Sequence, residues 1–185
     1  TGTGACTMKV RLDAGTKQKP GFSYSELEMF VLKGRIKFGK ETYGEGQYFF
    51  IPAGVFMPAM SSSRGCELIM MYNSSEPNFM ESDRDHDLAD RSQFSTVNAY
   101  EGLSWRVSIK QPGVNTGCLA KMLHMNPRTL ATTFMYCLVP EFYQDNISYH
   151  DCAEESYHIW GTSWMMQFGD LPTGGYFWRP PHINH

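Results

Sequence analysis

The sequence lacks several features that would assign it to a common functional class. It has no run of basic residues and its net charge is −3, so nothing in it favours a nucleic-acid or anionic-membrane partner. No apolar stretch approaches the roughly 20 residues that a membrane-spanning helix needs, and no signal-peptide pattern is present. We therefore expect a cytoplasmic protein that binds neither nucleic acid nor membrane.

Cysteine is scarce and has no metal-binding spacing. The five cysteines form no CxxC pair, which argues against a zinc ribbon, and their odd number fits reduced thiols in a cytosolic protein. They are Cys6, Cys66, Cys118, Cys137 and Cys152. We expect most of them to be buried as small hydrophobic residues; Cys152 differs because it lies beside His150 and Glu154.

Long amphipathic helices are also absent from the pattern. Short runs rich in branched and aromatic residues alternate instead with turns rich in Gly, Pro and Ser, which predicts an all-β sandwich or barrel. The predicted strands are "CTMKVRL", "LEMFVLKG", "RIKFG", "QYFFIP", "CELIMMY", "LSWRVSIK", "CLAKMLHM", "TTFMYCLVP", "SYHIWG", "SWMMQFG" and "GYFWRP".

The β-runs are interrupted once, by the charged stretch 74–97, where we expect a connector with one short helical turn near "DRDHDLADR". This divides the chain into a first barrel at 1–75, a connector at 76–105 and a second barrel at 106–185. His86 lies in the connector and is predicted to be a solvated loop histidine.

The two barrels are predicted because one phrase occurs twice. "GEGQYFFIPAGVFM" occupies residues 44–57, and the similar "PTGGYFWRPPHINH" occupies 172–185. The matched residues are Gly46, Tyr48, Phe49 and Pro52 in the first copy and Gly174, Tyr176, Phe177 and Pro180 in the second. Upstream, Glu28 and Gly34 match Glu155 and Gly161. The last position of the phrase holds Met57 in one copy and His185 in the other.

This spacing resembles the cupin superfamily, whose second motif runs Gly, five residues, Pro, one residue, Gly, two residues, His. The first copy keeps Gly46, Pro52 and Gly54 but has Met57 in place of the histidine. The second copy keeps Gly174, Pro180 and His185, with His182 in place of the second glycine.

The first cupin motif, His, one residue, His, three or four residues, Glu, six residues, Gly, is similar to the segment with His150, Glu154 and Gly161; Ser148 occupies its leading histidine position. In the first copy the Glu position is Leu27, and no histidine precedes His86.

The resemblance implies two tandem cupin barrels (double-stranded β-helix, jelly-roll), a bicupin most like the ChrR-like branch, which includes metal-binding anti-sigma-factor cupins and ketone-cleaving dioxygenases. It also implies one divalent metal held by His150, Glu154 and His185. Imidazole and carboxylate suit Fe(II), which we favour, and also Zn, Mn or Ni. The expected function is a dioxygenase acting on a small ketone- or diketone-like molecule. The alternatives are a non-catalytic metal- or ligand-sensing regulatory cupin and a Zn- or Mn-dependent lyase or isomerase.

Strand alternation sharpens the contrast between the copies. Residues two apart share a face, so Glu154, Ser156 and His158 point the same way, as do Leu27, Met29 and Val31 in the first copy. If these faces line the interiors, barrel one is packed with apolar side chains. A carboxylate inside barrel two costs several kcal/mol unless it meets a cation, a hydrogen-bond donor or water. A metal would meet this need most simply.

Several assignments stay open. The spacing to Gly161 favours Glu154 as the ligand, whereas the repeat pairs Glu155 with Glu28, and Glu155 is then a catalytic candidate. His158 is either a base or fourth ligand beside the metal or a hydrogen-bonded core residue. The other candidates for the substrate pocket are Tyr149, Cys152, Ser156, Trp164, Trp178 and His182. His124, among apolar neighbours in "KMLHM", is predicted to be a strand histidine.

The first copy continues past Met57 into "PAMSSSRGCELIMM", which would supply its closing strands, and the second copy has no such continuation. We therefore expect strands from a further segment or from a partner chain, with a homodimer as the simplest form.

Overall fold

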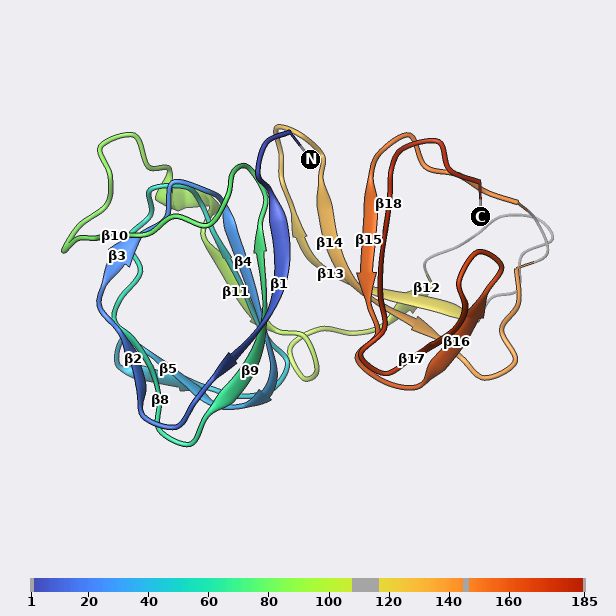
Figure 1. Cartoon of the computed structure of the whole chain (residues 1–185), viewed down its shortest axis with the longest axis horizontal. Helices are drawn as coiled ribbons and strands as arrows, with labels where there is room; N and C mark the ends of the chain where they lie inside the picture. The colour runs from blue at the N-terminus through green and yellow to red at the C-terminus, as the bar shows by residue number, and fades with distance from the viewer. Residues whose placement is uncertain (1, 108–116, 145–146, 185) are drawn as a thin grey trace. The chain divides into compact units, whose positions relative to one another are not determined.

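The computed structural model describes residues 2–107, 117–144 and 147–184, and the fold is all-β (Figure 1). The chain forms two compact units: unit 1 comprises 1–106 and 120–137, and unit 2 comprises 107–119 and 138–185. Within the described residues the one helix is the 3₁₀ turn η1, Arg91–Gln93. No helix in this part of the chain is long and apolar enough to cross a membrane.

Unit 1 is built from two antiparallel sheets. The larger has the strand order β1-β9-β4-β7-β11, and the smaller has the order β2-β8-β5-β6. The larger sheet comprises β1 (Cys6–Leu12), β4 (Leu27–Gly34), β7 (Gln47–Ile51), β9 (Cys66–Tyr72) and β11 (Ser95–Asn98). The smaller comprises β2 (Thr16–Gln18), β5 (Ile36–Phe38), β6 (Glu41–Tyr43) and β8 (Met60–Ser62). A third pair joins β3 (Gly21–Phe22) to β10 (Met80–Glu81).

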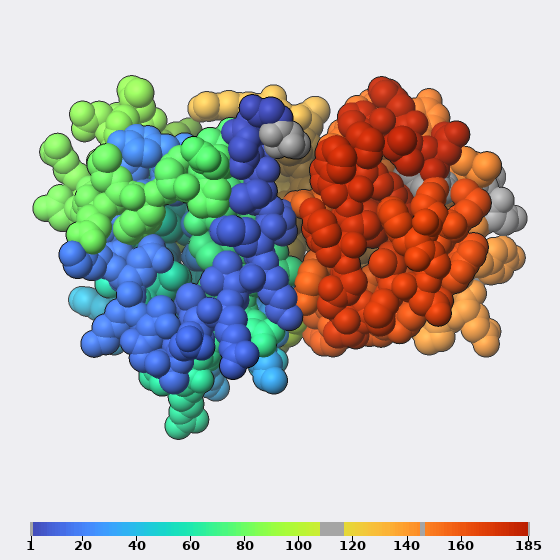
Figure 2. All heavy atoms as spheres, in the orientation of Figure 1, coloured from blue at the N-terminus to red at the C-terminus, as the bar shows by residue number. Residues whose placement is uncertain are grey.

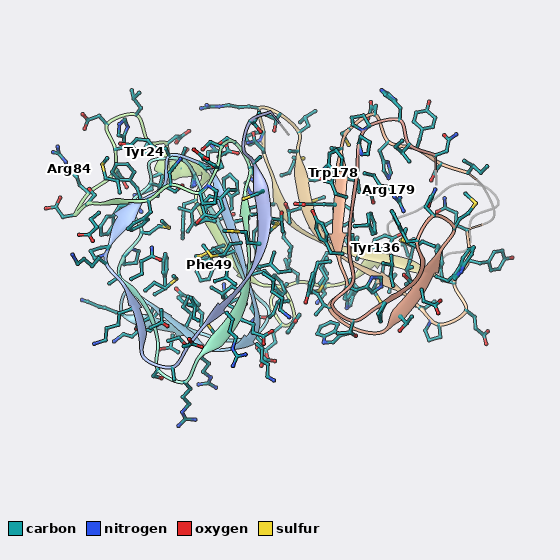
Figure 3. All side chains as sticks on the ribbon, viewed as in Figure 1. Tyr24, Phe49, Arg84, Tyr136, Trp178 and Arg179 are labelled. Atoms are coloured by element: carbon teal, nitrogen blue, oxygen red, sulfur yellow. The ribbon has the colours of Figure 1, made fainter. Side chains whose placement is uncertain are left out.

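The core of unit 1 lies between these sheets and consists mainly of apolar side chains, as the alternation of β4 predicts. Leu27, Met29 and Val31 on β4 are buried in one cluster with Met57. Phe49, on β7, points into the barrel (Figure 3). The predicted shared face of Leu27, Met29 and Val31 is therefore confirmed, and Met57 belongs to the same apolar cluster.

The segment predicted to be only a connector also contributes strands. β11 pairs with β7 at the edge of the larger sheet, and β10 pairs with β3. These short strands could not be predicted from an alternation of apolar and polar residues. The segment is rich in charged residues, and only Ala99 in it is fully buried. Figure 2 shows much of this segment, in light green, on the surface of unit 1. The predicted helical turn occurs a few residues later, as η1.

A hairpin covers the outer face of the larger sheet. It is formed by β13 (Cys118–Met125) and β14 (Thr132–Leu138), most of which belongs to unit 1. His124 stacks on Phe50 at a ring distance of 3.5 Å, and the Lys121 ammonium donates hydrogen bonds to the carbonyls of Ala99 and Tyr100. The face of β4 and β7 that points away from the barrel interior is thus buried as well.

Unit 2 contains two antiparallel strand pairs. β15 (Glu154–Tyr157) pairs with β18 (Tyr176–Arg179), and β16 (Thr162–Met165) pairs with β17 (Gly169–Pro172). β12 (Arg106–Val107) lies next to β13 in a three-stranded sheet.

The predicted strand "SYHIWG" is wrong in its bounds, because β15 begins at Glu154 and ends at Tyr157. The chain turns at Gly161, which has a left-handed φ of +75°.

Candidate metal and substrate site in the second repeat

Each repeat contains an antiparallel strand pair, and the two pairs have the same register. The pairs of β4 and β7 are, in order, Leu27 with Ile51, Glu28 with Phe50, Met29 with Phe49 and Phe30 with Tyr48. Those of β15 and β18 are Glu154 with Arg179, Glu155 with Trp178, Ser156 with Phe177 and Tyr157 with Tyr176. Each residue of the second repeat therefore has a defined counterpart in the first, and Glu154 corresponds to Leu27.

A tyrosine–glutamate hydrogen bond is repeated at matching positions. The Tyr48 hydroxyl donates to Glu28 Oε2 at 2.6 Å, and the Tyr176 hydroxyl donates to Glu155 Oε2 at 2.7 Å. Burial and the adjacent carboxylate raise the pKa of both tyrosines. Because this pair lies on the outer face in the first repeat, Glu155 is placed on the same side of its strand as Glu28, opposite to Glu154.

The turn that follows β7 in the first repeat also corresponds to the turn that follows β18 in the second. Gly54 donates a backbone hydrogen bond to the Ser23 carbonyl at 2.7 Å, and His182 donates the corresponding bond to the His150 carbonyl at 2.8 Å. Both donors have a left-handed backbone, with φ of +75° at Gly54 and +65° at His182. His182 therefore keeps the conformation of the glycine that it replaces, and His150 is the counterpart of Ser23.

The interior of barrel one shows where these counterparts converge. Ser23, Leu27 and Met57 line one cavity of about 50 Å³. Their positions in the second repeat hold His150, Glu154 and His185, the three predicted ligands. His185 lies outside the described residues, so this convergence is drawn from the first repeat.

The described part of the second site brings His150, Glu154 and Arg179 together. His150 Nε2 lies 3.7 Å from Glu154 Oε2, and Arg179 Nη1 lies 3.2 Å from the same oxygen. The carboxylate was expected to meet a cation, a donor or water, and here it meets a guanidinium cation. Among the described residues no group of three His, Cys, Asp or Glu side chains is close enough to hold a metal.

Arg179 is the residue of this site that the sequence analysis missed. Its side chain is buried beside the stacked rings of Phe177 and Phe168, whose centres lie 4.4 and 5.2 Å from the guanidinium carbon. The repeat contained the signal, because Arg179 occupies the position of Ile51, two residues after the matched Phe49 and Phe177. The difference between Ile51 and Arg179 is not visible when only the identical residues of the two repeats are compared.

The remaining predicted site residues are distributed around this cluster. Ser156 and His158 follow Glu154 on its face and are half-buried, and burial lowers the pKa of His158. His182 lies beside Tyr149, with ring centres 6.1 Å apart. Cys152, Trp164 and Trp178 are exposed. Trp178 lies on the Glu155 side of β18, opposite to Arg179 (Figure 3).

Unit 1 has a second, larger cavity of about 150 Å³ at its outer surface, lined by His124, Phe50 and Glu26 among others. Burial lowers the pKa of His124, although the nearby Glu28 carboxylate opposes this shift. Its Nε2 is buried and has no hydrogen-bond partner among the residues that the structure describes. The predicted strand position of His124 is confirmed, and this histidine lies apart from the residues that correspond to the candidate metal ligands.

A family model described as a domain of unknown function, DUF4437, matches residues 1–185. The chain belongs to this family. A comparison with curated proteins found no match.

Several solved structures share the fold of this DUF4437 chain at low sequence identity. A candidate dioxygenase from Nostoc punctiforme superposes with a TM-score of 0.89 at 23% identity, over 100% of this chain and 64% of that one. The YlbA protein of E. coli, of family DUF861, gives 0.57 at 18% identity over 99% and 72%. Oxalate decarboxylase from Bacillus subtilis gives 0.57 at 11% identity over 98% and 64%. The chain thus spans about 64% of the length of two of these structures. At these identities the likeness concerns the fold alone, and the predicted all-β class is confirmed.

Proposed function

We propose that this protein is a bicupin of the ChrR-like type and a metal-dependent enzyme acting on a small organic substrate, with the metal in the second repeat. Unit 1 would contain the first barrel and unit 2 the second. The observation that carries the proposal is the matched repeat. Strand register pairs Glu154 with Leu27, the following turn pairs His150 with Ser23, and the sequence repeat pairs His185 with Met57.

Two of the three proposed ligands, His150 and Glu154, lie close together in the described residues and support such a metal. His150 Nε2 and Glu154 Oε2 are 3.7 Å apart, and imidazole and carboxylate are the donors that Fe(II), Mn, Ni and Zn share. A bound divalent ion, Fe(II) in our proposal, would supply a Lewis acid and open coordination positions. The protein would contribute the geometry: β15 fixes Glu154, and the turn at His182 holds the backbone of His150.

The proposed reaction is a dioxygenation of a ketone- or diketone-like molecule, which the candidate dioxygenase of Nostoc punctiforme makes the first reaction to test. His158, half-buried with a lowered pKa, is well suited to accept a proton from the substrate at neutral pH. Tyr149, Cys152, Ser156, Trp164 and Trp178 would shape the pocket, and Glu155 would act through Tyr176.

The test is elemental analysis of the purified protein, followed by an oxygen-consumption screen with aryl ketones and diketones. The proposal predicts about one metal per chain and oxygen uptake with at least one substrate class. Metal without oxygen uptake would favour a metal-sensing cupin or a Zn or Mn lyase, and a protein without metal would overturn the proposal.

We also propose that the protein is a homodimer. In unit 1 the hairpin of β13 and β14 covers the outer face that carries Tyr48 and Phe50, whereas their counterparts Tyr176 and Trp178 are 48% and 47% exposed. Exposed aromatic faces of this kind are typical of interaction sites. A second copy, cytoplasmic like the first, would cover this face.

A further inference from the structure

The side chain of Arg179 is buried, and few of its hydrogen-bond donors have a partner among the residues that the structure describes. It is 3% exposed, and its one strong acceptor among the described residues is the Glu154 carboxylate. Its Nη2 contacts only the sulfur of Met165, at 3.7 Å, and its buried Nε has no partner within the described part of the chain. A guanidinium has five N–H donors and stays protonated in proteins, so a single carboxylate leaves this cation underused.

The charge of the site changes when Glu154 is shared with a metal. Glu154 and Arg179 together are neutral in the structure, as are their counterparts Leu27 and Ile51. Adding a divalent ion and neutral imidazole ligands gives a net charge of about +2 in a partly buried site, which is costly without anions. The other nearby carboxylate, Glu155, points to the opposite face and bonds Tyr176.

We propose that Arg179 is the specificity-determining residue of this site and that the substrate is an anion bearing a carboxylate. This inference rests on the proposed function, because it assumes a metal at His150 and Glu154. A substrate carboxylate would lower the positive charge, and it would accept the guanidinium N–H groups that Glu154 leaves unused. Arginine recognises carboxylates with two parallel hydrogen bonds, which lysine cannot form.

The test compares Arg179→Gln with Arg179→Lys in the full chain. Two quantities are measured by calorimetry: the affinity for Mn²⁺ as a metal probe, and the affinity of the metal-loaded protein for malonate. Malonamide, the neutral analogue of malonate, is the control ligand. Gln keeps a donor toward Glu154 and removes the charge, whereas Lys keeps the charge and removes the planar fork.

The expected effects of Arg179→Gln have opposite signs. Metal affinity should rise severalfold because one cation beside the metal is lost, and malonate affinity should fall by about tenfold or more because a charged hydrogen-bond pair is lost. Arg179→Lys should keep metal affinity near the original value and show intermediate malonate affinity. Malonamide should bind weakly to all three proteins. A merely structural arginine would instead lower both affinities in Arg179→Gln.

The outcomes separate this inference from the proposed function. A wild-type protein that takes up no Mn²⁺ overturns the proposed metal site. A protein that binds Mn²⁺ but does not distinguish malonate from malonamide overturns the role of Arg179 and leaves the metal site standing. Glu154→Leu combined with Arg179→Ile, which copies the neutral pair of the first repeat, is the folding control. It should stay folded and bind neither probe.

Discussion

The two repeats differ at one matched cross-strand pair. This pair is apolar in the first repeat, Leu27 with Ile51, and charged in the second, Glu154 with Arg179. In the first repeat this pair closes an apolar core. In the second it joins His150 in a cluster of ionisable groups. The strand pair keeps the same register with either the apolar or the charged residues, so its pairing does not depend on Glu154 and Arg179. The identity of this pair can therefore change the local charge without changing the strand register.

The largest expected effect is on metal content. His150→Ala should lower metal affinity by well over the roughly 10–100-fold that loss of an outer-shell partner costs, because it would remove one of three protein ligands. The matched change in the first repeat, Ser23→Ala, should leave metal content unchanged. Elemental analysis of both variants after dialysis, with far-UV circular dichroism to check the fold, tests the difference. Full metal occupancy in His150→Ala would show that this histidine is no ligand.

The tyrosine–glutamate hydrogen bond should contribute more to the free energy of unfolding in the first repeat than in the second. Tyr48→Phe leaves Glu28, which is 4% exposed, with the Asn73 amide, at 2.6 Å, as its remaining side-chain donor among the described residues. We expect a loss of about 1–3 kcal/mol in the free energy of unfolding, the usual effect of an unsatisfied buried acceptor. Tyr176→Phe acts on an exposed pair and should cost less than about 0.5 kcal/mol. Urea denaturation of the two variants measures both, and equal losses would mean that the two faces are equally covered in solution.

The stability of unit 1 should depend on pH through His124. Burial lowers its folded pKa below the ordinary value of 6.5, so the unfolded chain binds the proton more readily. The stabilisation is complete above pH 6.5 and is lost as the pH falls toward the folded pKa. His124→Phe, which keeps an aromatic ring against Phe50, should flatten this dependence between about pH 7.5 and 5.5.

Denaturation curves at both pH values test the prediction for His124. His158→Val, which copies Val31, is the companion variant in the second repeat and should flatten the profile in the same direction, because burial lowers the pKa of His158 too. An unchanged slope in His124→Phe would show that this histidine is solvated in the folded protein.

The smallest effect concerns assembly. If two copies meet through the face that carries Tyr176 and Trp178, Trp178→Glu should weaken the dimer without altering the fold of the subunit. Light scattering over a concentration series measures the change. Phe50→Leu, on the matching but covered face of the first repeat, should leave the assembly state as it is. A wild-type protein that stays monomeric would assign this face to another partner.

Much of the fold could be predicted from local pattern. The strands β1, β4, β9 and β13 coincide with predicted runs because branched and aromatic residues end at Gly or Pro turns there. Short strands such as β10 and β11 could not be predicted, since their pairing depends on β3 and β7, which are distant in sequence.

Only part of the candidate site could be predicted from the sequence. The resemblance to the cupin motifs pointed to His150, Glu154 and His185, whereas Arg179 lies at a position that those motifs leave unspecified. Glu154 lies near His150, whereas Glu155 bonds Tyr176. The strand register decides which of these two adjacent glutamates faces which side, and the sequence alone does not give the register.

The hairpin of β13 and β14 has a consequence for how the chain is made. Its residues follow the last strand of the larger sheet, β11, by about 20 positions, yet they cover the face that holds Glu28, Tyr48 and Phe50. During synthesis the first barrel can close before this cover emerges from the ribosome, and it would then expose an apolar face with a carboxylate at its centre. A fragment that ends at residue 106 would carry the same exposed face permanently. The first barrel should therefore be produced with residues up to 138, and chaperone binding during translation is expected within that interval.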